Sequence, residues 1–300
     1  MKRVLPLILV IVIFLAGIGM LSYPLISSVI NNIAARQQAD FYVEMTKEAD
    51  TSEIDAMFEK AQSYNDSLHK VILTDPFDAE SYGQIGEGYT ESLDIDGNGL
   101  IGYVDIPKIN VYLPIYHGTS LEILQKGAGH LEQTSLPIGG KGSHSVISAH
   151  SAFPGETFFD YLTDMEIGDE FYIHVLDRTL KYVVDDINVV LPEDVSKLYI
   201  DEDKDYVTLL TCTPYSVNTH RLLVRGVRAE YQAPQHPKRQ SLTVNQEQGS
   251  VFFLGYKLSY LTIGLFIGGF LLAVALIIVL FVVLGKKKNT HRPRHGEKKR

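Results

Sequence analysis

Residues 206–231 read YVTLLTCTPYSVNTHRLLVRGVRAEY, and this stretch decides the fold. It contains two runs typical of β-strands, Tyr206–Thr211 and Leu222–Tyr231, separated by a segment with a proline and small polar residues that is typical of a turn. Cys212 closes the first run and Arg221 opens the second. Neighbouring strands of this kind place a thiol and a guanidinium within reach of one substrate. The alternative interpretation is a core cysteine and a solvated arginine.

Further short β-type runs, with turns between them, precede this pair. They are Ile101–Ile106, Val111–Ile115, Ser145–Ser148, Glu170–Leu176 and Lys181–Leu191, and short helices are predicted to start near Ser120 and Thr157. Many short strands with few helices predict a mainly β domain, folded as a closed or nearly closed barrel. We place this domain at residues 91–232.

Residues 30–90, upstream of the barrel, are predicted to form a two-helix extension followed by a loop. The first helix is expected from Asn31 to about Ala49. Asp50 is a typical N-cap for the second helix, because an acidic residue follows three positions later and apolar residues then recur at helical spacing. Pro76 ends the helical pattern, since proline disfavours helical backbone in the residue before it.

Two apolar runs flank these regions. Val4–Leu21 is almost entirely apolar and Leu258–Gly285 has no charged residue, whereas about 20 apolar residues suffice to cross a bilayer as a helix. Ten of the 27 Lys and Arg residues lie just outside these runs, and all but one of the 36 Asp and Glu residues lie between them. Because basic flanks stay in the cytoplasm, we predict two spans with both termini cytoplasmic and the acidic middle outside.

The predicted organisation is therefore an N-terminal anchor at 1–29, a linker at 233–257, a second span at 258–285 and a basic tail at 286–300. A cleaved signal peptide is the alternative for the first apolar run. The acidic middle argues against nucleic acid as a partner, because phosphate binding needs a basic surface. Membrane lipid is the expected partner of the two spans.

Cys212 is the only cysteine, so the domain holds together without disulfides. With a single cysteine no Cys-x-x-Cys pair exists, and we expect neither a metal centre nor a cofactor. The DIDGNG run at 94–99 matches the front of an EF-hand calcium loop, but the twelfth position holds Asp105 instead of glutamate. A turn that leads into a strand is the alternative, and both interpretations remain open.

His150 directly follows the apolar run Val146–Ala149. A strand end can project a functional side chain from a rigid frame. By pattern alone, four other histidines remain alternatives: His117, His130, His144 and His220.

These motifs, taken together, resemble the sortases, and most closely their class C, the pilin-type sortases. Residues 208–213 are similar to the family's TLxTC signature, and 218–226 are similar to its arginine strand. GYVDIPKINVYLPIYHGT at 102–119 looks like its opening strands, and GAGHLEQTSLPIGGKGSHSVISAH at 127–150 looks like the stretch that ends in its histidine. Asp75-Pro76-Phe77 resembles the class C lid motif, and the second apolar run also fits class C.

The resemblance implies a sortase-type closed β-barrel and a cysteine transpeptidase on the outer face of a Gram-positive cell membrane. It implies that Cys212 is the nucleophile, His150 the catalytic histidine and Arg221 the catalytic arginine. It also implies a lid in which Asp75 pairs with Arg221 while Phe77 packs over the sulfur of Cys212. The Ser-Ala-Phe run after His150 departs from the His-Arg-Gly or His-Thr-Gly run of the family.

In that family the substrate is an LPXTG-like sorting signal, cleaved between Thr and Gly. A lysine amine of another pilin subunit then resolves the thioester acyl-enzyme, so the resemblance implies pilin subunits as partners and an isopeptide-linked polymer as product. The chemistry suits the residue types, because a thiolate is the attacking form of cysteine and a nearby imidazolium stabilises it. Two alternatives stay open: a housekeeping-type sortase that attaches surface proteins to the cell wall, and a non-catalytic membrane-bound β domain that binds a ligand.

Overall fold

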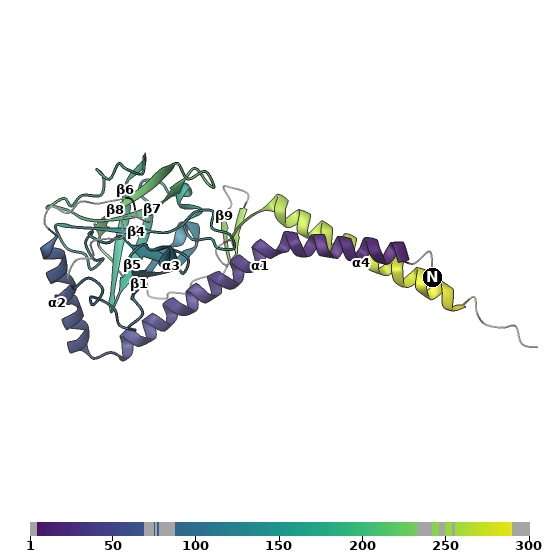
Figure 1. Ribbon diagram of the computed structural model, residues 1–300, viewed down its shortest axis with the longest axis horizontal. Coiled ribbons are helices and arrows are strands. Elements are labelled where there is room, and N and C mark those ends of the chain that lie inside the picture. The colour runs from purple at the N-terminus through teal and green to yellow at the C-terminus, as the bar shows by residue number, and fades with distance from the viewer. Residues whose placement is uncertain are drawn as a thin grey trace, which may run out of the picture. The chain divides into compact units, whose positions relative to one another are not determined.

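The computed structural model describes residues 5–68, 75, 77, 88–232, 242–245, 250–253 and 256–289. Eight strands form a closed barrel in the order β1-β2-β3-β4-β7-β8-β6-β5. Figure 1 shows labelled strands of this barrel gathered together, with α2 beside them. Their bounds are β1 Leu100–Ile106, β2 Val111–His117, β3 Ala128–His130, β4 Ser143–Ser148, β5 Glu170–Val175, β6 Arg178–Val190, β7 Asp205–Thr213 and β8 His220–Ala229. Two neighbouring pairs, β2 with β3 and β4 with β7, are parallel, and the other six are antiparallel. The predicted closed β-barrel is confirmed.

Strand β7 is covered on both of its faces. Val207 and Leu209 belong to the large cluster that fills the barrel interior. Leu210 points the other way, because side chains alternate along a strand, and it packs outside the barrel with Val146 and Leu223. We call this second group the outer cluster; its buried members are Leu131, Val146, Leu198, Leu210 and Leu223. Burial on both faces explains why the apolar residues of β7 occupy both of its faces instead of alternating strictly with polar ones.

The N-terminal helices are α1 (Leu5–Glu48) and α2 (Thr51–Ser67). The predicted start of the first helix at Asn31 is wrong, since α1 is continuous from Leu5. Once a helix is nucleated, each added residue gains a hydrogen bond, so the helix extends through the residues between the apolar run and Asn31. The predicted cap of the second helix is confirmed: the Asp50 carboxylate accepts from the Ser52 N–H at 2.8 Å.

The helical extension is docked on the barrel by specific contacts. The buried Tyr42 hydroxyl donates to the Ile101 carbonyl at 2.9 Å and accepts from the Leu176 N–H at 2.7 Å. On α2, the Phe58 ring lies 3.6 Å below the guanidinium carbon of Arg178, a cation–π contact. These bonds join α1 and α2 to β1 and to the β5–β6 hairpin.

Several sequence predictions of short elements need correction. Ser120 caps α3 (Leu121–Leu124) as expected, but no helix starts at Thr157; Phe158 and Phe159 turn into the core instead, and only a 3-10 turn, Leu162–Asp164, follows. Strand β3 was not predicted, because three residues are too short for a periodic pattern. In the predicted linker, the described residues form a small sheet of β9 (Leu242–Asn245), β10 (Ser250–Phe253) and β11 (Tyr256–Ser259).

The chain divides into two compact units, one of which (Ser27–Thr243 with Phe252–Tyr256) holds the barrel. The other unit consists of Met1–Ile26, Val244–Val251 and Lys257–Arg300, and contains α4 (Tyr260–Asn289). Among the residues that the structure describes, no helix combines the length and the apolar character that crossing a bilayer requires. The two predicted spans therefore find no support in the structure.

Candidate active site

Cys212 and Arg221 lie on the neighbouring antiparallel strands β7 and β8, and they face each other directly in the strand register. Directly opposed residues have their Cβ atoms about 4.5–5.5 Å apart and share one face of the sheet. Leu222, the next residue along, belongs to the barrel interior, whereas Leu210 and Leu223 belong to the outer cluster. The thiol and the guanidinium are therefore adjacent on the outer face, as the sequence predicted.

His150 comes from β4, the strand on the other side of β7. Strand β4 ends at Ser148, and the Ala149 N–H then donates to the Leu210 carbonyl at 3.1 Å, so the chain still follows β7 as it reaches His150. The Phe159 N–H donates to the His150 carbonyl at 3.0 Å and holds the backbone beyond the strand. Cys212 and Arg221 thus lie on β7 and β8, and His150 lies just beyond the end of the adjacent strand β4, at the same end of the barrel.

Burial disfavours charge on both the thiol and the imidazole. Cys212 is only 8% exposed, and burial raises its pKa to about 11, against the opposing effect of Arg221 and with a further increase from the Asp75 carboxylate. Burial also lowers the pKa of His150, and its buried Nε2 has no hydrogen-bond partner among the described residues. At neutral pH both groups are therefore mainly uncharged, which is a resting arrangement and not an active thiolate.

The Asp75 carboxylate binds the Arg221 guanidinium. Its two carboxylate oxygens accept from Nε of Arg221 at 2.8 Å and from Nη2 at 2.5 Å, while Nη1 donates to the carbonyls of Asn218 and His220 at 3.1 Å. The Arg221 and Asp75 side chains are 11% and 12% exposed. The predicted ion pair is confirmed. Its low exposure strengthens the attraction between the two charges, but the cost of removing both charges from water opposes that gain.

Phe77 lies beside the other two groups of the site. Its ring centroid is 5.4 Å from that of His150, with the planes tilted by 36°, and 5.1 Å from the guanidinium carbon of Arg221. The ring also packs against the outer cluster. Its contact with the sulfur of Cys212 stays a prediction. Together, Asp75 and Phe77 engage both neighbours of the thiol.

We expect Asp75→Ala to make the Cys212 thiol more reactive. The carboxylate raises the thiol pKa and Arg221 lowers it. Without the carboxylate, the positive charge of Arg221 is uncompensated, so the pKa falls and more thiolate is present at any pH below it. The rate of alkylation by iodoacetamide, followed from neutral to alkaline pH, should rise and reach its midpoint at a lower pH.

Two further variants complete this test. Phe77→Ala should also speed alkylation, because it uncovers the site without removing a charge. Glu193→Ala removes an exposed carboxylate elsewhere and should leave the rate unchanged. Indistinguishable profiles for the wild type, Asp75→Ala and Phe77→Ala would show that this segment does not guard the thiol.

The sequence did not reveal the role of the segment after His150. The Phe153 ring stacks on the imidazole of His150, with centroids 5.1 Å apart and planes 13° apart. Ala152 adopts a φ of 59°, in the left-handed region that favours glycine, and its N–H donates to the Asp160 carboxylate at 3.0 Å. The available signal was the departure from the family's run, in which glycine stands at the position of Ala152.

The alternative histidines have structural surroundings. The His130 ring bonds to the Tyr89 hydroxyl and the Ser135 carbonyl, and the His144 ring bonds to the Tyr199 carbonyl and the Thr208 hydroxyl. Burial lowers the pKa of His130 to about 3, and the pKa values of His117 and His144 to about 4, so these three stay neutral. His220 bonds to its neighbour Thr219 at the surface.

The possible calcium loop is used as a turn. The Asp94 carboxylate accepts from the Gly99 N–H, and the Asp96 carboxylate accepts from the Asn98 N–H, both at 2.9 Å. Within the described part of the chain, no cluster of three or more acidic, histidine or cysteine side chains is arranged to hold a metal ion. The turn interpretation accounts for both carboxylates.

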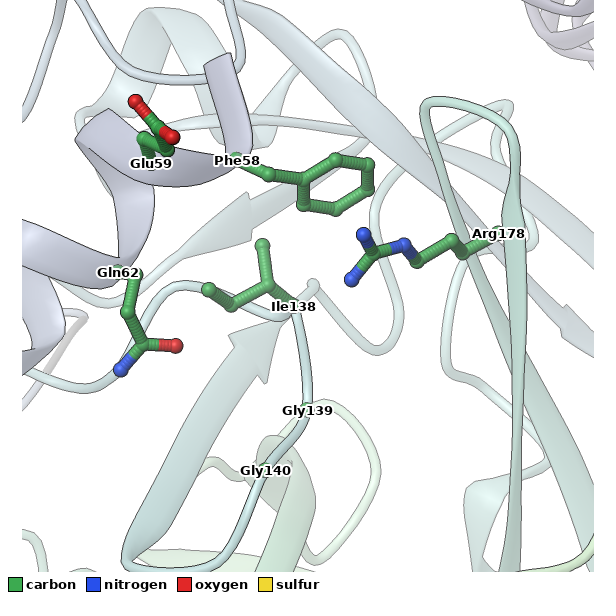
Figure 2. Close-up of a pocket in the computed structure, with 7 residues that line it drawn as sticks. All are labelled: Phe58, Glu59, Gln62, Ile138, Gly139, Gly140 and Arg178. Carbon is green, nitrogen blue, oxygen red and sulfur yellow. The ribbon is translucent and has the colours of Figure 1, made fainter. Parts of the chain in front are cut away.

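A separate hollow of about 430 Å³ lies between α2 and the barrel. Figure 2 shows the Arg178 guanidinium beside the Phe58 ring, with Ile138 next to them. None of the predicted site residues lines it. We therefore attribute it to the docking of α2 on the barrel.

Comparison with known proteins places this geometry in a family. Residues 104–229 match the sortase domain. The crystal structure of sortase C-1 from Streptococcus pneumoniae superposes with a TM-score of 0.61 at 43% identity, covering 65% of this chain and 100% of that one. The pilus-related sortase C of Group B Streptococcus gives a TM-score of 0.59 at 45% identity, covering 66% and 97%. Sortase A from Bacillus anthracis is 26% identical over 153 residues, 51% of this chain and 71% of that protein.

The matched sortase domain contains His150, Cys212 and Arg221. The identity to the sortase C structures extends over most of the chain. These matches agree with the barrel topology and with the resemblance seen in the motifs. The chain belongs to the sortase family of cysteine transpeptidases and, within that family, to class C.

Proposed function

We propose that this chain polymerises pilus subunits: it cleaves an LPXTG-like sorting signal between Thr and Gly and joins the new acyl group to a lysine amine of another pilin. The observation that carries the proposal is the direct opposition of Cys212 and Arg221 on β7 and β8, with His150 just beyond the end of the adjacent strand β4. The likeness to a pilus-related sortase C, at 45% identity, supports pilins as the substrate class.

The proposed reaction has two steps. The Cys212 thiol first passes its proton to the His150 imidazole. The resulting thiolate attacks the threonine carbonyl carbon, the Arg221 guanidinium stabilises the negative oxygen of the tetrahedral intermediate, and the C–N bond to glycine breaks. His150 gives its proton to the departing glycine amine and leaves a thioester. The lysine amine then attacks the thioester, loses a proton to His150 and releases the Cys212 thiolate, so that an amide bond replaces the one broken.

The contacts of Asp75 set a requirement for this reaction. Four of the five N–H groups of Arg221 are engaged: Nε and one N–H of Nη2 donate to Asp75, and Nη1 donates to two backbone carbonyls, so the face that could hold two oxygens at once is occupied. A sorting signal that uses this bidentate face of Arg221 must therefore displace Asp75. In the closed arrangement the buried thiol is kept from water, the competing acceptor of the acyl group.

The proposal is tested with the wild-type chain, a peptide that ends in an LPXTG-type signal, and acceptor amines. We expect mass spectrometry to detect a thioester on Cys212 and, with a pilin that supplies a lysine, an isopeptide-linked product. An acceptor with an α-amine that mimics the cell-wall cross-bridge serves as the comparison. Preference for that α-amine would favour the housekeeping alternative, and absence of any adduct would contradict the enzyme proposal.

We further propose that the chain is anchored in the cell membrane with its barrel outside and both termini in the cytoplasm. Support comes from the sequence: two long apolar runs with basic residues on their outer flanks and an acidic region between them. Reporter fusions at Lys2 and Arg300 should both report a cytoplasmic location. An external signal from the Arg300 fusion would contradict the second span.

A further inference from the structure

Two hydroxyl groups join the segments that carry His150 and Cys212. The Ser151 hydroxyl donates to the Cys212 carbonyl at 2.7 Å, and the Thr211 hydroxyl donates to the Ala149 carbonyl at 2.7 Å. Ser151 and Thr211 are both buried, with 7% and 1% of their surfaces exposed. The two bonds therefore lie on either side of His150, away from competing water.

These two hydrogen bonds lie just beyond the point where the backbone pairing between β4 and β7 ends. The last bond of the parallel ladder runs from the Ala149 N–H to the Leu210 carbonyl. If the ladder continued with its even spacing, the next bonds would run from the Cys212 N–H to the Ala149 carbonyl and from the Ser151 N–H to the Cys212 carbonyl. The side-chain hydroxyls of Thr211 and Ser151 donate to these same two carbonyls instead.

The replacement of backbone donors by hydroxyls has a geometric consequence. A continued strand would keep the segment after Ala149 straight along β7 and would fix His150 in the pleat. Because Ser151 bonds through its side chain, its backbone can turn away from β7. The hydroxyl bond still fixes the distance between Ser151 and the Cys212 carbonyl. The turn continues through Ala152 at positive φ and brings Phe153 against the imidazole.

We propose that Ser151 is a positioning residue for acyl transfer, whose hydroxyl bond to the Cys212 carbonyl sets the spacing between the His150 imidazole and the thiol. This inference rests on the proposed roles of His150 and Cys212. It does not follow from the family's pattern, since Ser151 lies in the run that departs from it. A displacement of reacting groups by about 1 Å costs on the order of 10²-fold in rate, so one bond at this place has a measurable effect.

The test compares Ser151→Thr with Ser151→Val, two side chains of the same shape that differ by a hydroxyl and a methyl group. At saturating sorting-signal peptide, we expect Ser151→Thr to form the Cys212 thioester at a rate near that of the wild type. Ser151→Val should do so about tenfold or more slowly, with an unchanged KM. Ser148→Ala is the matched control, because the Ser148 hydroxyl is also buried on β4 and has no partner among the described residues.

The comparison separates positioning from a general loss of structure. Rates are expressed per thiol titrated after unfolding, and circular dichroism melting is recorded for every variant. A slow Ser151→Val with an unchanged melting temperature and a normal Ser148→Ala supports the proposal. Equal rates of thioester formation for Ser151→Thr and Ser151→Val overturn it. A decrease in rate that parallels the decrease in melting temperature across all variants also overturns it. If the wild type forms no thioester, the proposed function fails, and that result is distinct from either outcome.

Discussion

Cys212→Ala will abolish acyl transfer, because it removes the only thiol in the chain. Loss of a catalytic nucleophile lowers kcat by roughly 10⁶-fold where this has been dissected, so we expect a decrease of at least about 10⁴-fold, below detection in a polymerisation assay. The barrel should survive, since removing one buried sulfur from β7 costs on the order of 1 kcal/mol in unfolding free energy. The measurements are the yield of isopeptide-linked product and the thioester adduct by mass spectrometry.

Cys212→Ser is the accompanying variant. It keeps a side chain of similar size opposite Arg221 but replaces the thiol by a hydroxyl, which ionises far less readily and is the weaker nucleophile. It should fold like the wild type and be inactive. Polymerisation by folded Cys212→Ala would end the enzyme proposal, and activity in Cys212→Ser alone would show that the thiol is not specifically required.

Arg221→Lys will lower kcat/KM by about 10²–10³-fold although it preserves the charge. Arg221 presents Nε and Nη2 to one pair of oxygens, a bidentate geometry that lysine cannot reproduce. The loss of a preorganised donor at a developing oxyanion has an effect of this size. Steady-state cleavage of a sorting-signal peptide measures it, with the larger part of the loss in kcat.

Arg225→Lys is the matched control for this change. Arg225 lies on the same strand and also binds a carboxylate in bidentate fashion, that of Asp185, at 3.0 and 2.9 Å. Its replacement should leave peptide cleavage nearly unchanged. In the background of Asp75→Ala, Arg221→Lys should remain slow, which separates catalysis from release of the lid. Wild-type rates for Arg221→Lys would contradict an oxyanion role.

The parts of the fold that sequence reasoning predicted are those governed by neighbours along the chain. Two runs typical of β-strands and the turn between them located β7 and β8, and with them the opposition of Cys212 and Arg221. The Asp50 cap was readable because an N-cap acts on the N–H groups two or three residues later. The end of β4 just before His150 was also predictable, because it follows from the local run of apolar residues.

The parts that sequence reasoning missed depend on distant contacts. Strand β3 has only three residues, and it exists because β2 and β4 lie on either side of it. The helix expected at Thr157 is replaced by a turn that buries Phe158 and Phe159 in the barrel, where burial outweighs local helical preference. The stacking of Phe153 on His150 requires a positive φ at Ala152, which no apolar periodicity signals.

The sequence by itself determined which reactive groups this protein has: one cysteine, at the end of a strand, opposite an arginine at the start of the next. Only the tertiary structure decided which partners these groups have and whether they are charged. The carboxylate that binds Arg221 comes from a residue 146 positions earlier, and the Phe77 ring beside His150 and Arg221 comes from the same segment. Burial and long-range charge set the pKa values of Cys212 and His150, and both depend on which side chains meet in space. Periodicity along the chain carries no information about such encounters, because they are made by the closed barrel and not by neighbours in sequence.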